Sequence, residues 1–213
     1  MNDSRQRGLL RLAHVGEQSE ATGEAMAEQR QRFQRLARED SAPRAVSSFN
    51  LFQTPETLAD QVAAMFTTFG RTLEPSAGLG RLYRAIRKRS ADCEITLVEN
   101  APQIAGELYR MTEGDSRAKL VQADFLECDS QRLGMFDAIL MNPPFKMRRD
   151  IKHIKHAATL LNRGGRLVAI CANGPRQREQ LQPLAFTWLE LPPASFKESF
   201  TNVAAAVVVF DRK

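Results

Sequence analysis

Residues 71–90 read RTLEPSAGLGRLYRAIRKRS, and this stretch decides the fold. Its first half predicts a strand that ends in a turn, because Gly78 and Gly80 allow a tight bend and a close approach of the backbone. Its second half favours a helix. A strand that passes through a glycine turn into a helix begins a βαβ unit, so the stretch predicts a parallel sheet covered by helices.

The same alternation continues to the end of the chain. It predicts right-handed crossovers and an α/β fold, namely a Rossmann-like, doubly wound, mainly parallel sheet of seven strands. Asp150 is the expected N-cap of a helix at 151–163. The strands are expected at 71–78, 94–100, 118–126, 136–142, 164–172, 187–192 and 203–210, and the other helices at 80–90, 101–112 and 175–185.

Composition divides the chain into two parts. Residues 1–45 are rich in Gln, Arg, Glu and Ala and contain no lysine. Met26, Phe33 and Leu36 form a stripe that is too sparse for a core of its own. We expect an N-terminal helical extension over 1–45 that docks on the body or on a partner, with disorder as the alternative. One globular domain is expected over 46–213.

Net charge and cysteine spacing indicate the cellular compartment but do not identify a partner. The formal net charge of +5 is a mild preference for anionic partners. No stretch reaches the roughly 20 apolar residues of a membrane helix, and the polar N-terminus lacks the apolar core of a signal peptide. Cys93, Cys128 and Cys171 are widely spaced and suit reduced, buried thiols. We therefore expect a cytoplasmic protein with no membrane partner and no metal.

Acidic residues stand at three successive strand ends: Glu74, Glu99 and Asp124. Ligands of an open parallel sheet bind at the carboxyl ends of its strands, so these carboxylates are expected at one site. Glu99 can hold both hydroxyls of a ribose, and Asp124 can accept from an exocyclic amine. The sequence has no GxGxxG or GxxxxGK[ST] loop, and Glu74 would repel a pyrophosphate. It suits a cationic amino group instead, so we expect S-adenosyl-L-methionine as the cofactor.

A second stretch, AILMNPPFKMRRD at residues 138–150, ends the fourth strand. Its two prolines cannot continue a central strand, because proline lacks a ladder donor and fixes φ. The chain must therefore leave the sheet in a stiff, extended turn with Asn142 and Phe145 at its mouth. Such a turn presents an amide, rigid carbonyl groups and an aromatic face at one strand end.

Six motifs, taken in order, resemble those of the gamma-type N6-adenine DNA methyltransferases. The most specific are the NPPF tetrapeptide and its distance behind EPSAGLG. The resemblance covers residues 50–210 and implies a class I, S-adenosyl-L-methionine-dependent methyltransferase domain over 46–213. The motifs are FQTPETLADQV, LEPSAGLGRL, LVEN, QADFL, FDAILMNPPF and FKESFTNVAAAVVVF.

The resemblance implies how the NPPF turn works. In that family the asparagine side chain and the following proline carbonyl accept hydrogen bonds from the target amino group, while the aromatic residue stacks on the base. An aryl amine is a poor nucleophile, and two rigid acceptors held out of the ring plane favour the pyramidal nitrogen of the transition state. Direct displacement needs no Ser or Cys nucleophile. The expected catalytic residues are Asn142, Pro143, Pro144 and Phe145.

The same resemblance implies that Phe52 and Thr54 pack on and hydrogen-bond the methionine moiety of the cofactor. Phe196 is expected to stack on a flipped base, with Phe200 as the alternative. The basic residues that follow the turn are expected to bind phosphate groups of the substrate. The alternative is that they form a solvent-exposed helix face. His153 and His156, in the same run, are interpreted as surface residues. The expected cofactor-binding residues are Phe52, Thr54, Glu74, Pro75, Ala77, Gly78, Gly80, Glu99, Asn100, Asp124, Phe125 and Asn142; those for substrate are Phe145, Lys146, Arg148, Arg149 and Phe196, with Lys152 and Lys155 beside them.

The substrate class stays open between several alternatives. Gamma-type DNA enzymes usually carry a recognition domain after the last motif, and this sequence stops at Lys213, so we expect little intrinsic sequence recognition. N6 of adenine in DNA is the first expectation. Adenine-N6 RNA and protein-glutamine N5 methyltransferases use the same turn and remain alternatives, as does an inactive cofactor-binding partner subunit. Specificity could come from the extension, a homodimer or a separate subunit.

Overall fold

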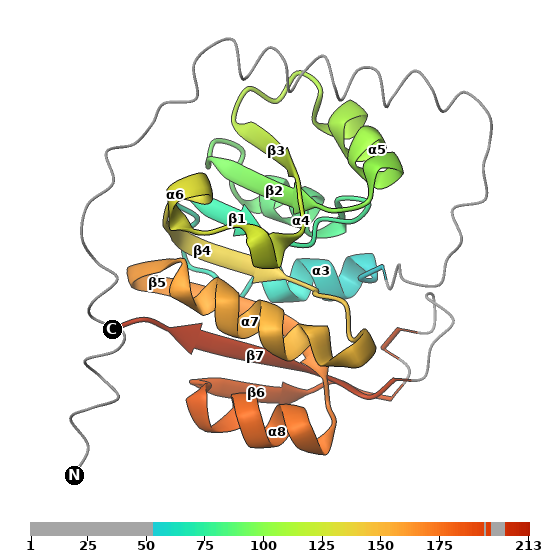
Figure 1. Ribbon diagram of the computed structural model, residues 1–213, viewed down its shortest axis with the longest axis vertical. Helices are drawn as coiled ribbons and strands as arrows, with labels where there is room; N and C mark the ends of the chain where they lie inside the picture. Colours follow the sequence, from blue (N-terminus) through green and yellow to red (C-terminus); the bar gives the residue numbers. More distant parts are fainter. Residues whose placement is uncertain (1–52, 194, 197–202) are drawn as a thin grey trace.

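A central seven-stranded sheet organises the protein, and its strand order is β3-β2-β1-β4-β5-β7-β6 (Figure 1). The computed structural model describes residues 53–193, 195–196 and 203–213. Phe52, Phe200 and the extension predicted over 1–45 lie outside the described residues. The strands are β1 (Thr72–Glu74), β2 (Ile95–Glu99), β3 (Ala118–Gln122), β4 (Phe136–Met141), β5 (Leu161–Ala172), β6 (Thr187–Glu190) and β7 (Ala205–Asp211).

Strand direction agrees with the expected doubly wound fold. The first five strands pair in parallel, with β1 at the centre between β2 and β4. β7 runs antiparallel to both β5 and β6. The prediction of a mainly parallel, seven-stranded α/β sheet is therefore confirmed. Because chain order reverses on either side of β1, the carboxyl ends of β1, β2 and β4 meet at the switch point where such folds bind ligands.

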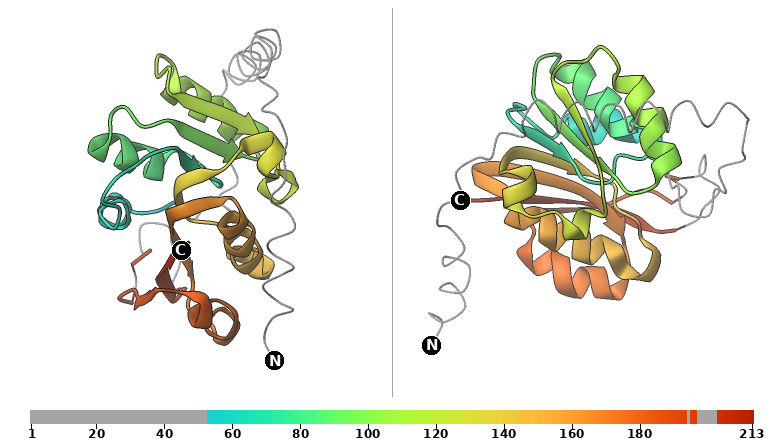
Figure 2. Two further views of the ribbon diagram at one scale, coloured as in Figure 1. Left: turned by 90° about the vertical axis from the view of Figure 1, so that its left-hand side faces the viewer. Right: turned by 45° about the horizontal axis from the view of Figure 1, so that its top comes forward.

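Helices cover both faces of the sheet and make three layers (Figure 2). α3, α4 and α5 pack on one face in a single apolar core, and α6, α7 and α8 pack on the other. Strand β5 serves both cores, since Val168 and Ile170 belong to the first and Leu167 and Ala169 to the second. Within the described residues, the helices are α3 (Glu56–Ala63), α4 (Arg81–Arg89), α5 (Pro102–Thr112), α6 (Ser130–Leu133), α7 (Arg149–Thr159) and α8 (Pro175–Leu181), with 3-10 segments η2 (Phe125–Glu127), η3 (Lys146–Arg148) and η4 (Gln182–Leu184).

The predicted bounds of the helix at 151–163 are wrong at both ends. α7 begins at Arg149, and β5 already starts at Leu161, where it pairs with Phe136 of β4. Asp150 is not the N-cap but a fully buried residue of the first turn. Its carboxylate accepts hydrogen bonds from the Ala172 amide and the Gln177 side chain, at 3.1 and 3.0 Å. Asp150 thus ties the start of α7 to the end of β5 and to α8.

Helix α3 was not among the predicted elements. It starts directly after Pro55 and buries Leu58, Ala59 and Val62 against α4. The signals were present, because Pro55 precedes an acidic first turn and the buried residues have helical spacing. Among the described residues, no helix is long and apolar enough to span a membrane.

Candidate active site

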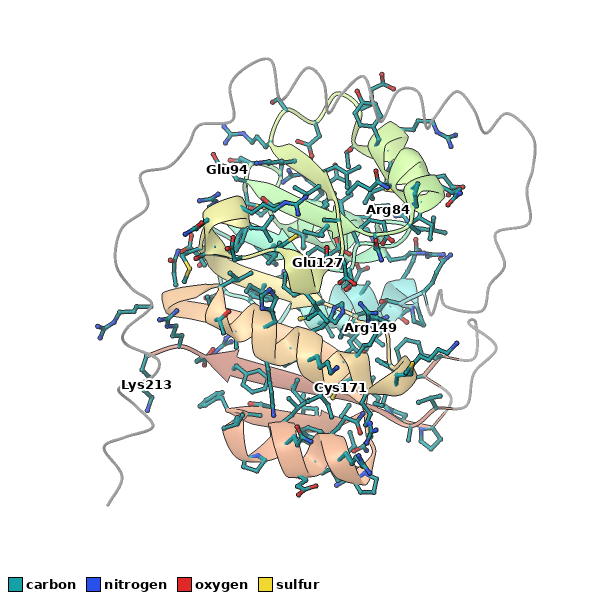
Figure 3. The ribbon with its side chains drawn as sticks, in the orientation of Figure 1. Arg84, Glu94, Glu127, Arg149, Cys171 and Lys213 are labelled. Atoms are coloured by element: carbon teal, nitrogen blue, oxygen red, sulfur yellow. The ribbon has the colours of Figure 1, made fainter. Side chains whose placement is uncertain are left out.

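A cavity of about 900 Å³ opens where β1, β2 and β4 end. Its walls come from the loops that follow those strands and from the segment between β4 and α7. Figure 3 labels Arg149, which stands at the start of α7 and borders this cavity. Residues of three predicted motifs, EPSAGLG, LVEN and NPPF, therefore face one space, although Glu74 and Asn142 are 68 positions apart in the sequence (142 − 74).

Glu74, the last residue of β1, places a carboxylate in the cavity wall. The residue is 1% exposed, and its Oε2 atom has no hydrogen-bond partner among the described residues. Burial raises the pKa of Glu74 well above its ordinary value, and the nearby charge of Glu99 adds to the rise. A buried acceptor without a donor is costly, and a cationic amino group in the cavity would supply the missing partner. The site therefore fits a ligand with an ammonium group.

Glu99, at the end of β2, holds two loops together. Its Oε2 accepts from the Gly78 amide at 2.9 Å, and its Oε1 accepts from the Ala101 amide at 2.8 Å. An ionised carboxylate has about four acceptor positions, so both oxygens can accept a further hydrogen bond. These bonds fix the carboxylate at the edge of the cavity, where ribose hydroxyls could donate to it.

Asp124 is held differently from the other two acids. Its Oδ1 accepts from the Leu126 amide at 3.0 Å, and its Oδ2 pairs with Arg149 Nη2 at 2.7 Å. Burial alone would raise the pKa of Asp124, but the bonds to Arg149 and Leu126 outweigh it and lower that pKa. The neighbouring Phe125, and not Asp124, contributes to the cavity wall. The structure therefore does not place Asp124 where the expected contact with an exocyclic amine would form.

The two glycines of the first turn have different positions. Gly78, with φ of +51°, lines the cavity. Gly80, with φ of +71°, packs on α5, where a Cβ would lie 2.7 Å from Met111 Sδ. Gly80 therefore permits the turn and the contact between α4 and α5, whereas Gly78 provides the close approach to the cavity.

The turn after β4 is fixed by a hydrogen bond to the segment that precedes α3. Asn142 Nδ2 donates to Thr54 Oγ1 at 3.0 Å, and Thr54 is itself buried just before α3. This bond orients the amide plane of Asn142, while Pro143 and Pro144 stiffen the backbone that follows. Asn142, Pro143 and Pro144 all line the cavity. The turn thus brings rigid acceptors to the same space as Glu74 and Glu99.

The two predicted stacking residues pack on each other. The rings of Phe145 and Phe196 meet edge to face with centroids 6.2 Å apart, and Phe196 is fully buried. Neither residue belongs to the cavity wall of this structure. Stacking on a base would require these rings to separate.

The segment after Phe145 has an unusual backbone. Met147 and Arg148 adopt φ of +55° and +61°, and among the described residues they are the only non-glycine residues with positive φ. Left-handed geometry costs roughly 1–2 kcal/mol for an ordinary residue. Hydrogen bonds from Arg148 N to Phe145 O and the Arg149–Asp124 ion pair hold the turn. Lys146, Arg148, Lys152 and Lys155 are exposed along this segment and α7, whereas Asp150 points inward.

His153 is not the surface residue that the sequence suggested. It is 4% exposed, lines the cavity, and lies with Asp150, Ile154 and Ala157 on the inner face of α7. Its Nδ1 is 3.4 Å from Ser76 Oγ. Burial, followed by the charge of Arg149, lowers the pKa of His153 to about 4, so the ring is neutral at pH 7.

His156, one turn along α7, is also not fully exposed. It is half-buried, and its Nε2 lies 2.7 Å from the Cys128 carbonyl oxygen. The surface interpretation was wrong for both histidines, because the buried face of α7 is wider than the predicted apolar stripe and includes Asp150, His153 and Ala157. Within the described part of the chain, no three His, Cys, Asp or Glu residues form a group that could hold a metal ion.

The cavity brings together most, but not all, of the predicted site. Gly80, Asp124, Phe145, Arg148 and Phe196 do not line it. Sequence reasoning assigned no site role to Met147 and His153, which do. The predicted residues that line the cavity are Thr54, Glu74, Pro75, Ala77, Gly78, Glu99, Asn100, Phe125, Asn142, Pro143, Pro144, Lys146 and Arg149.

Comparison with known proteins provides a family and relatives. Residues 51–190 match the model of the methyltransferase small domain family. The ribosomal RNA small subunit methyltransferase C of Shewanella loihica is 36% identical over 80 residues, which cover 37% of this chain and 22% of that protein. The chain thus spans less than a quarter of the length of that relative.

Two solved structures have a similar fold. A proposed RNA methyltransferase from Pyrococcus horikoshii has a TM-score of 0.62 and 16% identity, over 86% of this chain and 98% of that one. The glycopeptide N-methyltransferase MtfA, solved with S-adenosyl-L-homocysteine, has a TM-score of 0.54 and 14% identity, over 74% and 87% of the two chains. Together with the family match, these relatives indicate S-adenosyl-L-methionine as the cofactor, and the buried carboxylate of Glu74 fits its amino group.

Proposed function

The chain belongs to the methyltransferase small domain family, and from this premise we propose that it transfers a methyl group from S-adenosyl-L-methionine to an exocyclic amino group of a base in RNA. The single observation that carries the proposal is the shared cavity. Glu74 and Glu99 line it beside Asn142 and Pro143, so a cofactor and an amino group could meet there. Adenine N6 is the first target to test, because the NPPF turn resembles that of adenine-N6 enzymes.

The residues of the chain have separate tasks in this reaction. The bound cofactor supplies an electrophilic methyl group on a sulfonium ion. Glu74 holds its amino group and Glu99 its ribose hydroxyls, which positions the methyl group. The Asn142 side chain and the Pro143 carbonyl accept from the target amino group, so they favour the nitrogen geometry of the transition state. Because Thr54 and the prolines fix these acceptors beforehand, little reorganisation is needed at the moment of transfer.

The cysteines have no part in this chemistry. All three are buried, and burial raises the pKa of Cys128 and raises that of Cys171 to about 12. A thiol in such an environment is a poor nucleophile, because the thiolate is the reactive form. Direct transfer to nitrogen therefore agrees better with the site than a covalent enzyme intermediate.

RNA is favoured by the relatives, and DNA by the motifs. The Shewanella loihica relative is named as a ribosomal RNA methyltransferase. The Pyrococcus horikoshii structure is named as a proposed RNA methyltransferase. The order of the motifs from FQTP to NPPF instead resembles DNA adenine enzymes, so N6 of adenine in DNA is the second candidate. The exposed basic residues Lys146, Arg148 and Lys152 suit either RNA or DNA, because they would bind backbone phosphates and not the edges of nucleobases.

One experiment separates these candidates. Purified protein and S-adenosyl-L-methionine with a labelled methyl group are incubated with total RNA, genomic DNA, and a protein extract. We expect label in RNA that survives DNase and protease. Label confined to DNA would establish the second candidate, label on protein glutamine would overturn both, and cofactor binding without transfer would indicate an inactive partner subunit.

A further inference from the structure

Met147 is an exposed apolar side chain at the mouth of the cavity. It is 82% exposed, which makes it the most exposed large hydrophobic residue of the described chain. It nevertheless belongs to the cavity wall, two residues after Phe145. Neither the cofactor-binding loops nor the NPPF acceptors use it. Its position therefore indicates a task other than holding the cofactor or accepting from the target amino group.

Met147 projects outward from a backbone conformation that is unfavourable for methionine. Methionine gains nothing from left-handed geometry, whereas Asn or Asp could stabilise it by local hydrogen bonds. The turn persists because both sides are anchored: Asn142 is bonded to Thr54, and Asp150 is bonded to the end of β5. A strained conformation that the surroundings enforce points to a functional role for the residue it displays.

The neighbours of Met147 define the kind of partner that it could meet. Lys146 and Arg148 flank it and are exposed, and the next acid in the chain, Asp150, is buried. The apolar tip therefore stands among cations. A partner that offers anionic groups on its outside and apolar planar faces within reach is a stacked nucleic acid. Apolar wedges that enter base steps have this combination of contacts.

We propose that Met147 is a wedge that enters the base stack when a target nucleotide leaves it, so that it positions the target base in the cavity. Lys146 and Arg148 would hold the phosphates on either side. This inference rests on the proposed function, because it needs a nucleic acid substrate. It goes further in assigning a residue to base extrusion, the step whose cost depends on whether the target is stacked.

The test compares a stacked with an unpaired target. The RNA that the wild-type protein labels is prepared in two forms, one with the target base in a stem and one with the same sequence unpaired. Met147→Gly removes the side chain but tolerates the positive φ, Met147→Leu keeps an apolar tip, and Phe186→Ala is a control at another exposed apolar residue on the edge of the sheet. The rates are measured as kcat and KM, and 2-aminopurine at the target position reports unstacking by fluorescence.

We expect Met147→Gly to lower kcat/KM at least tenfold on the stem and at most threefold on the unpaired RNA, with a smaller rise in 2-aminopurine fluorescence. Met147→Leu should recover at least half of the activity on the stem, and Phe186→Ala should match the wild type on both. An equal loss on both RNAs, or none on the stem, would overturn the wedge and leave the proposed function intact. If the wild type labels no nucleic acid, the proposed function and the wedge both fail.

Discussion

The loops after β1 and β2 and the segment after β4 face one cavity, yet their polar groups are held in different ways. Glu74 and Glu99 are set in the wall by burial and by backbone amides. The basic residues Lys146 and Arg148 are exposed, and Met147 between them is exposed as well. The first region is complete apart from a cation for Glu74, whereas the second presents groups that need a large partner.

The two regions would recognise their ligands by different means. A small cofactor of fixed shape can be met by carboxylates that are positioned in advance, which limits the entropy lost on binding. A polymer with repeating phosphates can be bound by flexible basic side chains, because electrostatic attraction to phosphate does not depend on precise geometry. The Asn142 turn stands between the regions and is fixed like the first, as catalysis requires.

Removing the acceptor between the two regions should have the largest effect. Asn142→Ala is expected to lower kcat by about 10²–10³-fold, the range for losing one group that stabilises a transition state. The affinity for S-adenosyl-L-homocysteine, measured by calorimetry, should change less than threefold. Asn162→Ala, which removes a more distant amide that bonds Asp137, is the control and should keep normal turnover. Normal turnover in Asn142→Ala would show that the turn is not catalytic.

Neutralising the buried carboxylate should affect only ligands that carry a charged α-ammonium group. Glu74→Gln keeps the size of the side chain and is expected to weaken S-adenosyl-L-homocysteine by about 10–100-fold, as one charge-assisted bond would predict. Binding of 5′-methylthioadenosine, which lacks the amino acid, should not change. The protein without ligand should melt at a higher temperature, because a buried carboxylate whose Oε2 atom has no partner among the described residues is replaced by a neutral group. Equal weakening of both ligands would contradict the assigned contact.

The buried histidine beside the cofactor loops gives that region a pH dependence. The pKa of His153 is about 4 in the folded protein and near 6.5 when unfolded, so unfolding takes up a proton between these values. Its contribution to stability is complete above pH 6.5 and falls as the pH falls towards 4, by up to about 3 kcal/mol. The groups facing it are Arg149, Asp124 and His156.

His153→Gln should therefore gain stability relative to the wild type as the pH is lowered from 7 to 4, in denaturant unfolding at several pH values. His156→Gln, on the same helix, controls for the loss of any histidine there. A difference between wild type and His153→Gln that stays constant with pH would show that His153 is not held neutral.

The exposed region should show the smallest effects for each residue. Arg148→Ala and Lys152→Ala are each expected to weaken RNA binding a few-fold and to reduce the slope of log affinity against log salt by about 0.7–0.9. Arg89→Ala, in the last turn of α4 and outside the cavity wall, should leave the slope unchanged. Fluorescence anisotropy over a series of salt concentrations measures this. A slope equal to that of the wild type in Arg148→Ala and Lys152→Ala would place the nucleic acid elsewhere.

The sheet and the cofactor end of the site were predictable because their signals are local. Each strand, its turn and the acid at its end lie within a few residues, as in RTLEPSAG and LVEN. The rule that ligands bind at strand ends then brought Glu74, Glu99 and Asn142 together without knowledge of any contact. The strands predicted from this alternation lie where the structure has them, apart from shifts at their ends.

The other end of the site was less predictable because its geometry depends on distant contacts. Asp124 was expected to face the ligand, but Arg149, 25 residues later, pairs with it (149 − 124). His153 became buried because Asp150 is drawn into the core by Ala172 and Gln177. No local sequence pattern predicts the left-handed backbone of Met147, which the hydrogen bonds of Asn142 and Asp150 on either side enforce. Such contacts between remote residues cannot be read from spacing alone.

If the turn after β4 accepts from an exocyclic amino group while the loops after β1 and β2 hold the cofactor, the methyl group must be transferred to an exocyclic nitrogen. The identity of the methylated atom is therefore decisive. RNA treated with the protein and with cofactor that carries a deuterated methyl group is digested, and the nucleosides are identified by mass spectrometry against standards. We predict the label on an exocyclic amino nitrogen, first N6 of adenine, and its absence with Asn142→Ala. Label on a ring carbon or a ribose hydroxyl would contradict the assignment of the Asn142 turn.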